Sequence, residues 1–197
     1  MKVGYNMQKI ISTWKMSYEG IQCAKEALKQ GKTMQEAIKV AIQNVESNPS
    51  FVSVGTGGLP NQEGYVQLDG AYMNGKDLSF GGVMEAQTIK SPIAVSMDLA
   101  KHTYNCLLAG SGADQYAIAQ GFAQAEHLTP SSYERYLKAK ETALKAYDGH
   151  DTVCVIGYDD GHVQVGVSTS GLFMKHPGRV GDSPIIGSGF YADDELG

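Results

Sequence analysis

Residues 148–171, "DGHDTVCVIGYDDGHVQVGVSTSG", contain the feature that most restricts how this chain can fold. Two runs of β-forming residues, 152–158 and 162–168, flank the pair Asp160-Gly161. This pair favours a two-residue turn, because both positions tolerate a positive φ. The sequence therefore predicts an antiparallel hairpin, which needs further strands or helices to bury its apolar face.

The remaining pattern predicts helices and antiparallel strands in a layered α+β domain rather than a regular βαβ alternation. Thr33 and Glu36 form a capping-box pattern at the start of the clearest helix, which ends before Pro49. All 197 residues are expected to form a single domain. The other expected helices are 18–30, 92–102, 111–121 and 130–146, and the other expected strands are 8–13, 51–55, 65–73, 78–85 and a buried 105–110.

Composition excludes several classes of function. The net charge is −5 and no basic cluster is present, so nucleic acid is not expected as a partner. No apolar run is long enough for a signal peptide or a membrane span, which predicts no membrane partner. Cys23, Cys106 and Cys154 form no C-x-x-C motif, which suits a reducing, cytoplasmic setting. The histidines lack metal-ligand spacing, and no cofactor is required.

The first hairpin strand follows the polar triplet His150-Asp151-Thr152. A threonine hydroxyl is a weak nucleophile unless a base lies beside it, and its own α-amine can be that base. The α-amine has a pKa of about 7.7–8.0, so much of it is neutral near pH 8. Thr152 exposes this amine only after the bond from Asp151 is cut. The triplet therefore suggests a self-cleavage site, although such a triplet before a strand is more often an ordinary loop.

Arg179 and Asp182 lie three residues apart in a loop punctuated by glycine and proline. Arginine offers a planar fork for a carboxylate, and aspartate offers a counter-charge for an ammonium group. Together they could bind the two charged groups of a free α-amino acid. The alternative is a surface ion pair between the two, contributing about 0–1 kcal/mol.

Five segments together resemble the glycosylasparaginase family of N-terminal nucleophile hydrolases: "STW" near the start, "SVGTGGLPN", "HDTV", "STSG" and "GRVGDSPIIGSG". The resemblance spans the chain. It implies a four-layer αββα sandwich and a precursor that cuts itself before Thr152. Residues 1–151 would then be the α-subunit region and 152–197 the start of the β-subunit region. The implied substrate is a small molecule, glycosylasparagine or asparagine, and the implied assembly is a homodimer of precursors or αβ units.

The resemblance also assigns roles to matching positions. Thr152 resembles the nucleophile, Asp151 the residue that self-cleavage releases as a new C-terminus, and Thr169 the threonine that supports the nucleophile. These three are the expected catalytic residues.

Four further matches concern substrate binding. Arg179 and Asp182 match the pair that holds the substrate's α-carboxylate and α-amino groups. Trp14 and Ser53 match two residues that line the site. Without the resemblance, Trp14 would more often be core and Ser53 a turn residue.

Family members continue beyond the point where this chain stops, with a T-G-x-G segment that forms the oxyanion hole. We therefore expect a C-terminally truncated member of the family. Two alternatives stay open. One is an L-asparaginase or β-aspartyl peptidase, which "HDT" disfavours because that branch usually has glycine before the threonine. The other is an inactive fragment that only binds an amino acid.

Overall fold

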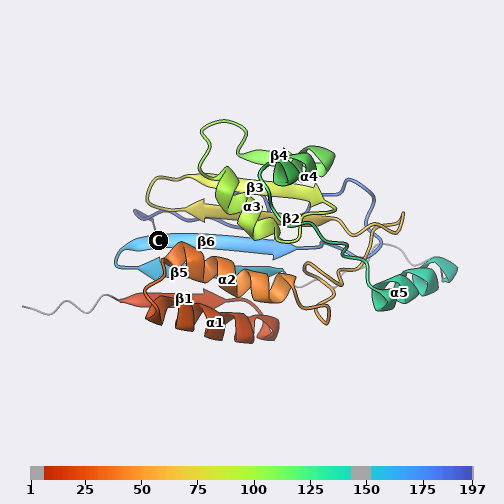
Figure 1. The fold of residues 1–197 in the computed structure, drawn as a ribbon, viewed down its shortest axis with the longest axis horizontal. Coiled ribbons are helices and arrows are strands. Elements are labelled where there is room, and N and C mark those ends of the chain that lie inside the picture. Colours follow the sequence, from red (N-terminus) through yellow and green to blue (C-terminus); the bar gives the residue numbers. More distant parts are fainter. Residues whose placement is uncertain (1–6, 143–151, 197) are drawn as a thin grey trace, which may run out of the picture.

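The computed structural model describes residues 7–142 and 152–196, and within them one mixed six-stranded sheet lies behind a layer of helices (Figure 1). Every neighbouring pair of strands is antiparallel except β3–β4, which is parallel. In sheet order the strands are β1 (Gln8–Ser12), β5 (Val153–Asp159), β6 (His162–Thr169), β2 (Leu68–Asn74), β3 (Phe80–Ala86) and β4 (Leu107–Ala109).

Helices cover one face of this sheet, and α5 lies beyond its end (Figure 1). None of the described helices has the length and apolar character required to cross a bilayer. The helices are the short 3₁₀ helix η1 (Lys15–Ser17), α1 (Tyr18–Lys29), α2 (Met34–Glu46), α3 (Pro92–Leu99), α4 (Gly110–Ala119) and α5 (Pro130–Glu141).

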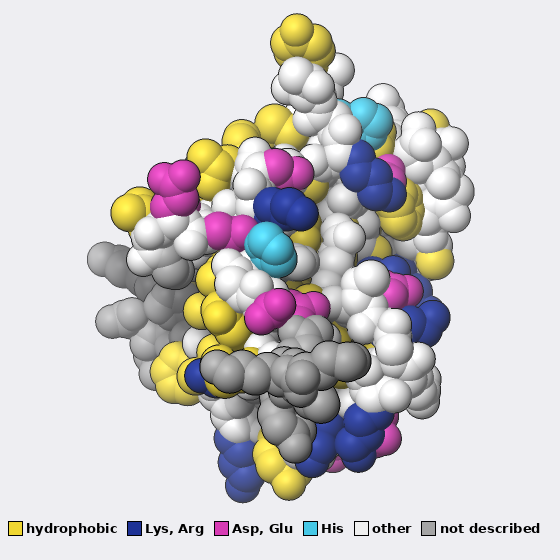
Figure 2. Space-filling model, turned by 90° about the vertical axis from the view of Figure 1, so that its left-hand side faces the viewer, with side chains coloured by type: hydrophobic (Ala, Val, Ile, Leu, Met, Phe, Trp, Pro, Cys, Tyr) yellow, Lys and Arg dark blue, Asp and Glu magenta, His cyan; other side chains and the backbone are white. Residues whose placement is uncertain are grey.

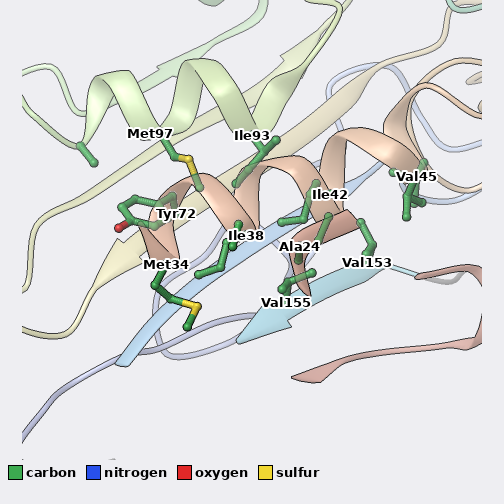
Figure 3. Packing of buried hydrophobic residues seen from close by; sticks show 14 residues of the cluster. Ala24, Met34, Ile38, Ile42, Val45, Tyr72, Ile93, Met97, Val153 and Val155 are labelled. Atoms are coloured by element: carbon green, nitrogen blue, oxygen red, sulfur yellow. The ribbon is translucent and has the colours of Figure 1, made fainter. Parts of the chain in front are cut away.

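Helix α2 forms the centre of the core. Its capping box is present: the Glu36 amide donates to Thr33 Oγ1 over 3.2 Å, and the Thr33 amide donates to Glu36 Oε2 over 2.9 Å. The apolar stripe of α2 packs on β5 and β6, and side chains of α3 belong to the same core (Figure 3). The helix lies so close to the sheet that a Cβ added at Gly166 would be 2.8 Å from Ile42 Cδ1. A larger residue at Gly166 would push α2 away from the sheet.

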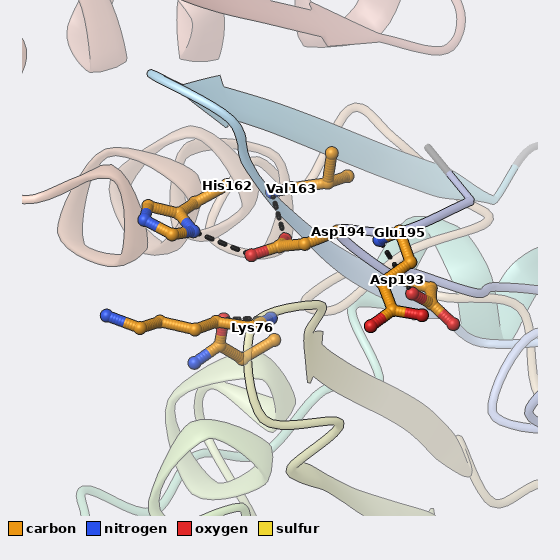
Figure 4. A network of polar contacts seen from close by, with 7 residues as sticks. Lys76, His162, Val163, Asp193, Asp194 and Glu195 are labelled. Carbon is orange, nitrogen blue, oxygen red and sulfur yellow. Dashed lines mark hydrogen bonds and ion pairs between the residues drawn. The ribbon is translucent and has the colours of Figure 1, made fainter.

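The C-terminal segment crosses the opposite face of the sheet, where Phe190 and Ala192 pack on side chains of β2 and β6. Asp194 fastens this segment: it accepts hydrogen bonds from His162 Nδ1 at 2.6 Å and from the Val163 amide at 2.9 Å (Figure 4). On the end of the molecule that contains the β5–β6 turn, basic and acidic side chains are interspersed (Figure 2).

Most of the expected elements are confirmed, including the hairpin, whose turn residues Asp160 and Gly161 have φ values of 48° and 95°. Two expectations are wrong. Residues 51–55 form turns instead of a strand, because Gly55 and Gly57 bring their backbone against the end of α2 and Pro49 with positive φ. Within 105–110, strand β4 is short and partly exposed rather than buried, because it lies at the sheet edge.

Glu46, the last residue of α2, is completely buried without a described cation in contact. Ser91 Oγ donates to its Oε2 over 2.6 Å, and the Ile93 amide donates to its Oε1 over 3.0 Å. Burial raises the pKa of Glu46 to about 7 despite these bonds. The folded protein therefore holds this proton more tightly than the unfolded chain does.

Glu46→Gln should flatten the dependence of stability on pH. For the wild type, the stabilisation from protonated Glu46 is complete below the unfolded pKa of 4.5 and is lost as the pH rises to about 7. At about 1.4 kcal/mol for each pH unit between 4.5 and 7, the full loss is about 3.5 kcal/mol, of which about 2.5 kcal/mol falls between pH 5 and pH 8. Urea unfolding at pH 5 and pH 8 measures it. Glu26→Gln, which removes an exposed carboxylate paired with Lys29, should keep the wild-type dependence of the free energy of unfolding on pH. If Glu46→Gln also kept the wild-type dependence, Glu46 would not be the buried carboxyl responsible for it.

Candidate active site

The candidate residues meet at one end of the sheet, where β5 begins and β6 ends. The register pairs Val153 with Ser168, so Thr152 comes next to Thr169. Val153 belongs to the core against α2, whereas Cys154 packs on the opposite face. Because side chains alternate along a strand, Thr152 and Thr169 share the face opposite the helices.

Thr152 is fixed on both sides while its side chain stays partly exposed. Its hydroxyl lies 2.9 Å from Ser183 Oγ. Its carbonyl accepts a 2.8 Å hydrogen bond from Thr13 Oγ1, and the same Thr13 oxygen accepts one from the Cys154 amide over 2.9 Å. The Thr13 side chain therefore clamps the start of β5 from the neighbouring β1.

Thr169 is buried, and its hydroxyl both donates and accepts a hydrogen bond. It donates to the Ser53 carbonyl over 3.4 Å and accepts from the Gly171 amide over 3.0 Å. The Ser53 carbonyl also accepts the Ser170 amide at 2.7 Å. Ser53 thus lies beside Thr169, and it is the backbone carbonyl of Ser53 that makes these bonds. They fix how the chain leaves β6.

Arg179 and Asp182 lie in the loop that follows β6, and the structure does not join them in an ion pair: the pairs found among the described residues are elsewhere. Arg179 is partly exposed and points toward Gly171, with Nη1 3.5 Å from the position of an added Cβ. Asp182 is exposed and directly precedes Ser183, the residue that touches Thr152. The same loop thus carries Arg179, Asp182 and the Thr152 contact Ser183, and no ion pair joins the two charged side chains.

Trp14 lies next to Thr13, at the edge of the same region. Its side chain is 59% exposed and its φ is 63°, an unusual value for a non-glycine residue. It is therefore a surface residue beside the site rather than core. The remaining candidate, Asp151, lies outside the described residues.

Four polar residues at this site were not anticipated: Ser183, Asp69, Glu85 and Lys175. Asp69 pairs with Thr169 across β2 and β6, and it is completely buried. Lys175 is 1% exposed. Burial raises the pKa of Asp69 and lowers that of Lys175. A carboxylate inside the apolar run "YVQLDGAYM" was the available signal for Asp69; Lys175 had none.

A separate cavity lies away from these residues. A cavity of about 520 Å³ lies toward the other end of the sheet, lined in part by Asn74, Ser79 and Lys101. None of the candidate residues lines it. The residues around Thr152 therefore form a candidate site separate from this cavity.

The arrangement can support acyl transfer. Thr152 supplies a positioned hydroxyl, and its α-amine would be an adjacent base once freed. Arg179 and Asp182 carry opposite charges that form no ion pair among the described residues, and the two could bind the carboxylate and ammonium groups of an amino acid. No cluster of three or more metal-ligating side chains occurs in the described part of the chain.

The family model and three known proteins that resemble this chain all have names that include asparaginase. A family model described as asparaginase matches residues 6–197. The N(4)-(beta-N-acetylglucosaminyl)-L-asparaginase of Elizabethkingia miricola is 34% identical, over 98% of this chain and 58% of that protein. The plant-type L-asparaginase of Pyrococcus abyssi is 33% identical, over 91% and 63%. The isoaspartyl peptidase/L-asparaginase of Bos taurus is 36% identical, over 86% and 58%. This chain thus spans 58–63% of the length of these relatives.

Thr13→Val should loosen the start of β5. The substitution keeps the shape of the side chain but removes the hydroxyl that binds both Thr152 and the Cys154 amide. We expect a loss of about 1–2 kcal/mol in the free energy of unfolding and faster hydrogen exchange at the Cys154 amide. Thr13→Ser retains the hydroxyl and should resemble the wild type. Equal exchange rates in the valine and serine variants would contradict the clamp.

Proposed function

Because this chain belongs to the asparaginase family, we propose that it is a self-processing amidohydrolase that releases aspartate from an asparagine side-chain amide. Thr152 would be its nucleophile. The preferred substrate would be asparagine that carries an N-linked sugar.

The observation that carries this proposal is the position of the Thr152 hydroxyl. It lies 2.9 Å from the Oγ atom of Ser183, and Ser183 belongs to the loop that also contains Arg179 and Asp182. A substrate whose charged groups bound Arg179 and Asp182 would therefore have its side-chain amide close to the Thr152 oxygen. The resemblance assigns the same roles to these three residues independently of their contacts.

Self-processing would start with attack of Thr152 Oγ1 on the carbonyl carbon of Asp151. The C–N bond between the two residues would break, and the acyl group would pass to oxygen as an ester. The amide nitrogen would take up a proton and become the α-amine. Water would then hydrolyse the ester, which frees Asp151 as a C-terminus and restores the Thr152 hydroxyl. The clamp from Thr13 would hold the Thr152 carbonyl during this step.

In turnover, the α-amine of Thr152 would accept the hydroxyl proton as Oγ1 attacks the side-chain amide carbon. The departing nitrogen would take this proton and leave as an amine or ammonia. The aspartyl ester left on Thr152 would be hydrolysed by water, which releases aspartate. Thr169 would support the nucleophile by fixing the end of β6 beside it.

Two observations favour different substrates. The triplet ending in Thr152 matches the glycosylasparaginase pattern, and the relative from Elizabethkingia miricola bears that name. The relatives from Pyrococcus abyssi and Bos taurus are named for L-asparaginase and isoaspartyl peptidase, at similar identity. An L-asparaginase or β-aspartyl peptidase is therefore the second candidate. An inactive protein that only binds aspartate is the third.

We further propose the four-layer αββα arrangement and the homodimer that the resemblance implies. The sheet face opposite the helices exposes apolar side chains near the edge, Ile11 at 67% and its cross-strand partner Ile156 at 40%. A second sheet packed there would bury them. Cys23, Cys106 and Cys154 are all free thiols, which agrees with a reducing cytoplasmic location as part of this proposal.

The direct test is the N-terminus produced on incubation. The purified protein, held near pH 7.5, should give a new N-terminus at Thr152, seen by intact mass and N-terminal sequencing. Thr152→Ala should remain whole, because alanine has no hydroxyl to attack the carbonyl. Thr142→Ala, which alters an exposed threonine at the end of α5, should process like the wild type.

Cleavage of Thr152→Ala at the same bond, or cleavage elsewhere in the wild type, would contradict the proposal. Release of aspartate from glycosylasparagine, free asparagine and a β-aspartyl dipeptide then separates the three functional candidates. The proposal expects the highest kcat/KM for glycosylasparagine.

A further inference from the structure

Two buried carboxylates and two cations gather behind Thr169. Asp69 and Lys175 are almost fully buried, and Glu85 and Arg179 are partly buried. Their formal charges sum to zero. Buried charges are costly unless they are balanced, so two buried and two partly buried charges in one place call for a physical reason.

The carboxylates are placed by the sheet. Asp69 lies on β2 directly opposite Thr169. Glu85 occupies the irregular position between β2 and β3 with a φ of 56°, and its amide donates to Asp69 Oδ1 over 2.9 Å. Asp69 Oδ2 and Glu85 Oε1 are buried and have no hydrogen-bond partner among the described residues. Two acceptors are thus left with unused capacity.

The cations converge from the loop after β6. A Cβ added at Gly171 would lie 3.1 Å from Lys175 Nζ and 3.5 Å from Arg179 Nη1, so both charged ends flank one point. Lys175 Nζ donates to the Gln67 carbonyl over 3.3 Å. Within the described residues, neither cation lies within 4.0 Å of a carboxylate oxygen. Glu85 Oε1 nevertheless comes within 3.6 Å of the Cβ position of Gly178, the residue before Arg179.

We propose that Lys175 is a positioning residue, whose buried charge offsets part of the negative charge of Asp69 and Glu85 and thereby leaves the Arg179 guanidinium free for the substrate carboxylate. This inference rests on the proposed function of Arg179. The physical reason is competition. Two buried carboxylates with unused acceptor oxygens attract the nearest cation, and an arginine can satisfy a carboxylate with two parallel bonds. With Lys175 in place, part of that attraction is met by an ammonium group that is buried and bonded to the Gln67 carbonyl.

Removal of the Lys175 charge should therefore draw Arg179 inward. In Lys175→Met, KM for asparagine should rise about tenfold with kcat within about threefold, because binding rather than chemistry is lost. Modification of Arg179 by phenylglyoxal, followed by mass spectrometry of its peptide, should slow by a similar factor. Lys101→Met is the matched control: it removes a lysine from an exposed ion pair with Asp98 and should change neither value.

A triple variant in which all three side chains are uncharged decides between positioning and simple packing. Asp69→Asn, Glu85→Gln and Lys175→Met together remove both carboxylates and the lysine charge while they keep the side-chain shapes, which buried sites often tolerate. We expect KM and the Arg179 modification rate to return to within about threefold of the wild type. If Lys175 only fills space, the triple variant will be as impaired as the single one, and that result overturns the proposal.

Failure of this inference can be told apart from failure of the proposed function. The rate of Arg179 modification requires no turnover, so it reports the position of the guanidinium even if the wild type releases no aspartate. If Lys175→Met does not fold, the triple variant still decides, because a raised KM or slow modification there contradicts the proposal. An unchanged modification rate in a folded Lys175→Met also contradicts it.

Discussion

The register of the three central antiparallel strands is the constraint on which both the core and the candidate site depend. Strand β6 pairs on one side with β5, through Val153 and Ser168, and on the other with β2, through Asp69 and Thr169. Since side chains alternate, a slip of one residue would turn every side chain of the slipped strand to the other face. It would move Val153 out of the core against α2 and point Thr152 into it. The burial of apolar side chains therefore also fixes where the nucleophile candidate stands.

This coupling places the core against α2 on one face of the sheet and the candidate site on the other. On the first, α2 lies close because β5 and β6 present Gly157 and Gly166 to it. On the second, Thr152, Thr169 and Asp69 come from adjacent strand ends, and the loop after β6 completes the site. Groups held on packed strands keep their geometry better than groups on loops alone. Here the nucleophile candidate directly precedes β5 and lies beside strand residues of β6, and the charges that would bind substrate come from the loop.

The sequence predicts those parts of the structure that depend on local chemistry. The Asp160-Gly161 turn, the Thr33 capping box and the apolar stripe of α2 each follow from neighbouring residues, and all three are present. The strand expected at 51–55 does not form, because tertiary contact of Gly55 with the end of α2 outweighs the β propensity of this segment. The role of Ser183 and the gathering of Asp69 near Lys175 depend on cross-strand pairing and on a long loop. Neither can be predicted from the spacing of residues in the sequence. The candidate residues that belong to sequence motifs, in contrast, could be named from the sequence alone.

The central claim is that Thr152 carries the aspartyl group as an ester during turnover, and trapping of that ester tests it most directly. Hydroxylamine added during hydrolysis competes with water for the ester and forms β-aspartyl hydroxamate. Glycosylasparagine and asparagine differ in their leaving groups but would give the same ester on Thr152. The account predicts one ratio of hydroxamate to aspartate for both substrates at a fixed hydroxylamine concentration. Ratios that differ between the substrates, or the absence of hydroxamate while aspartate is released, would contradict it.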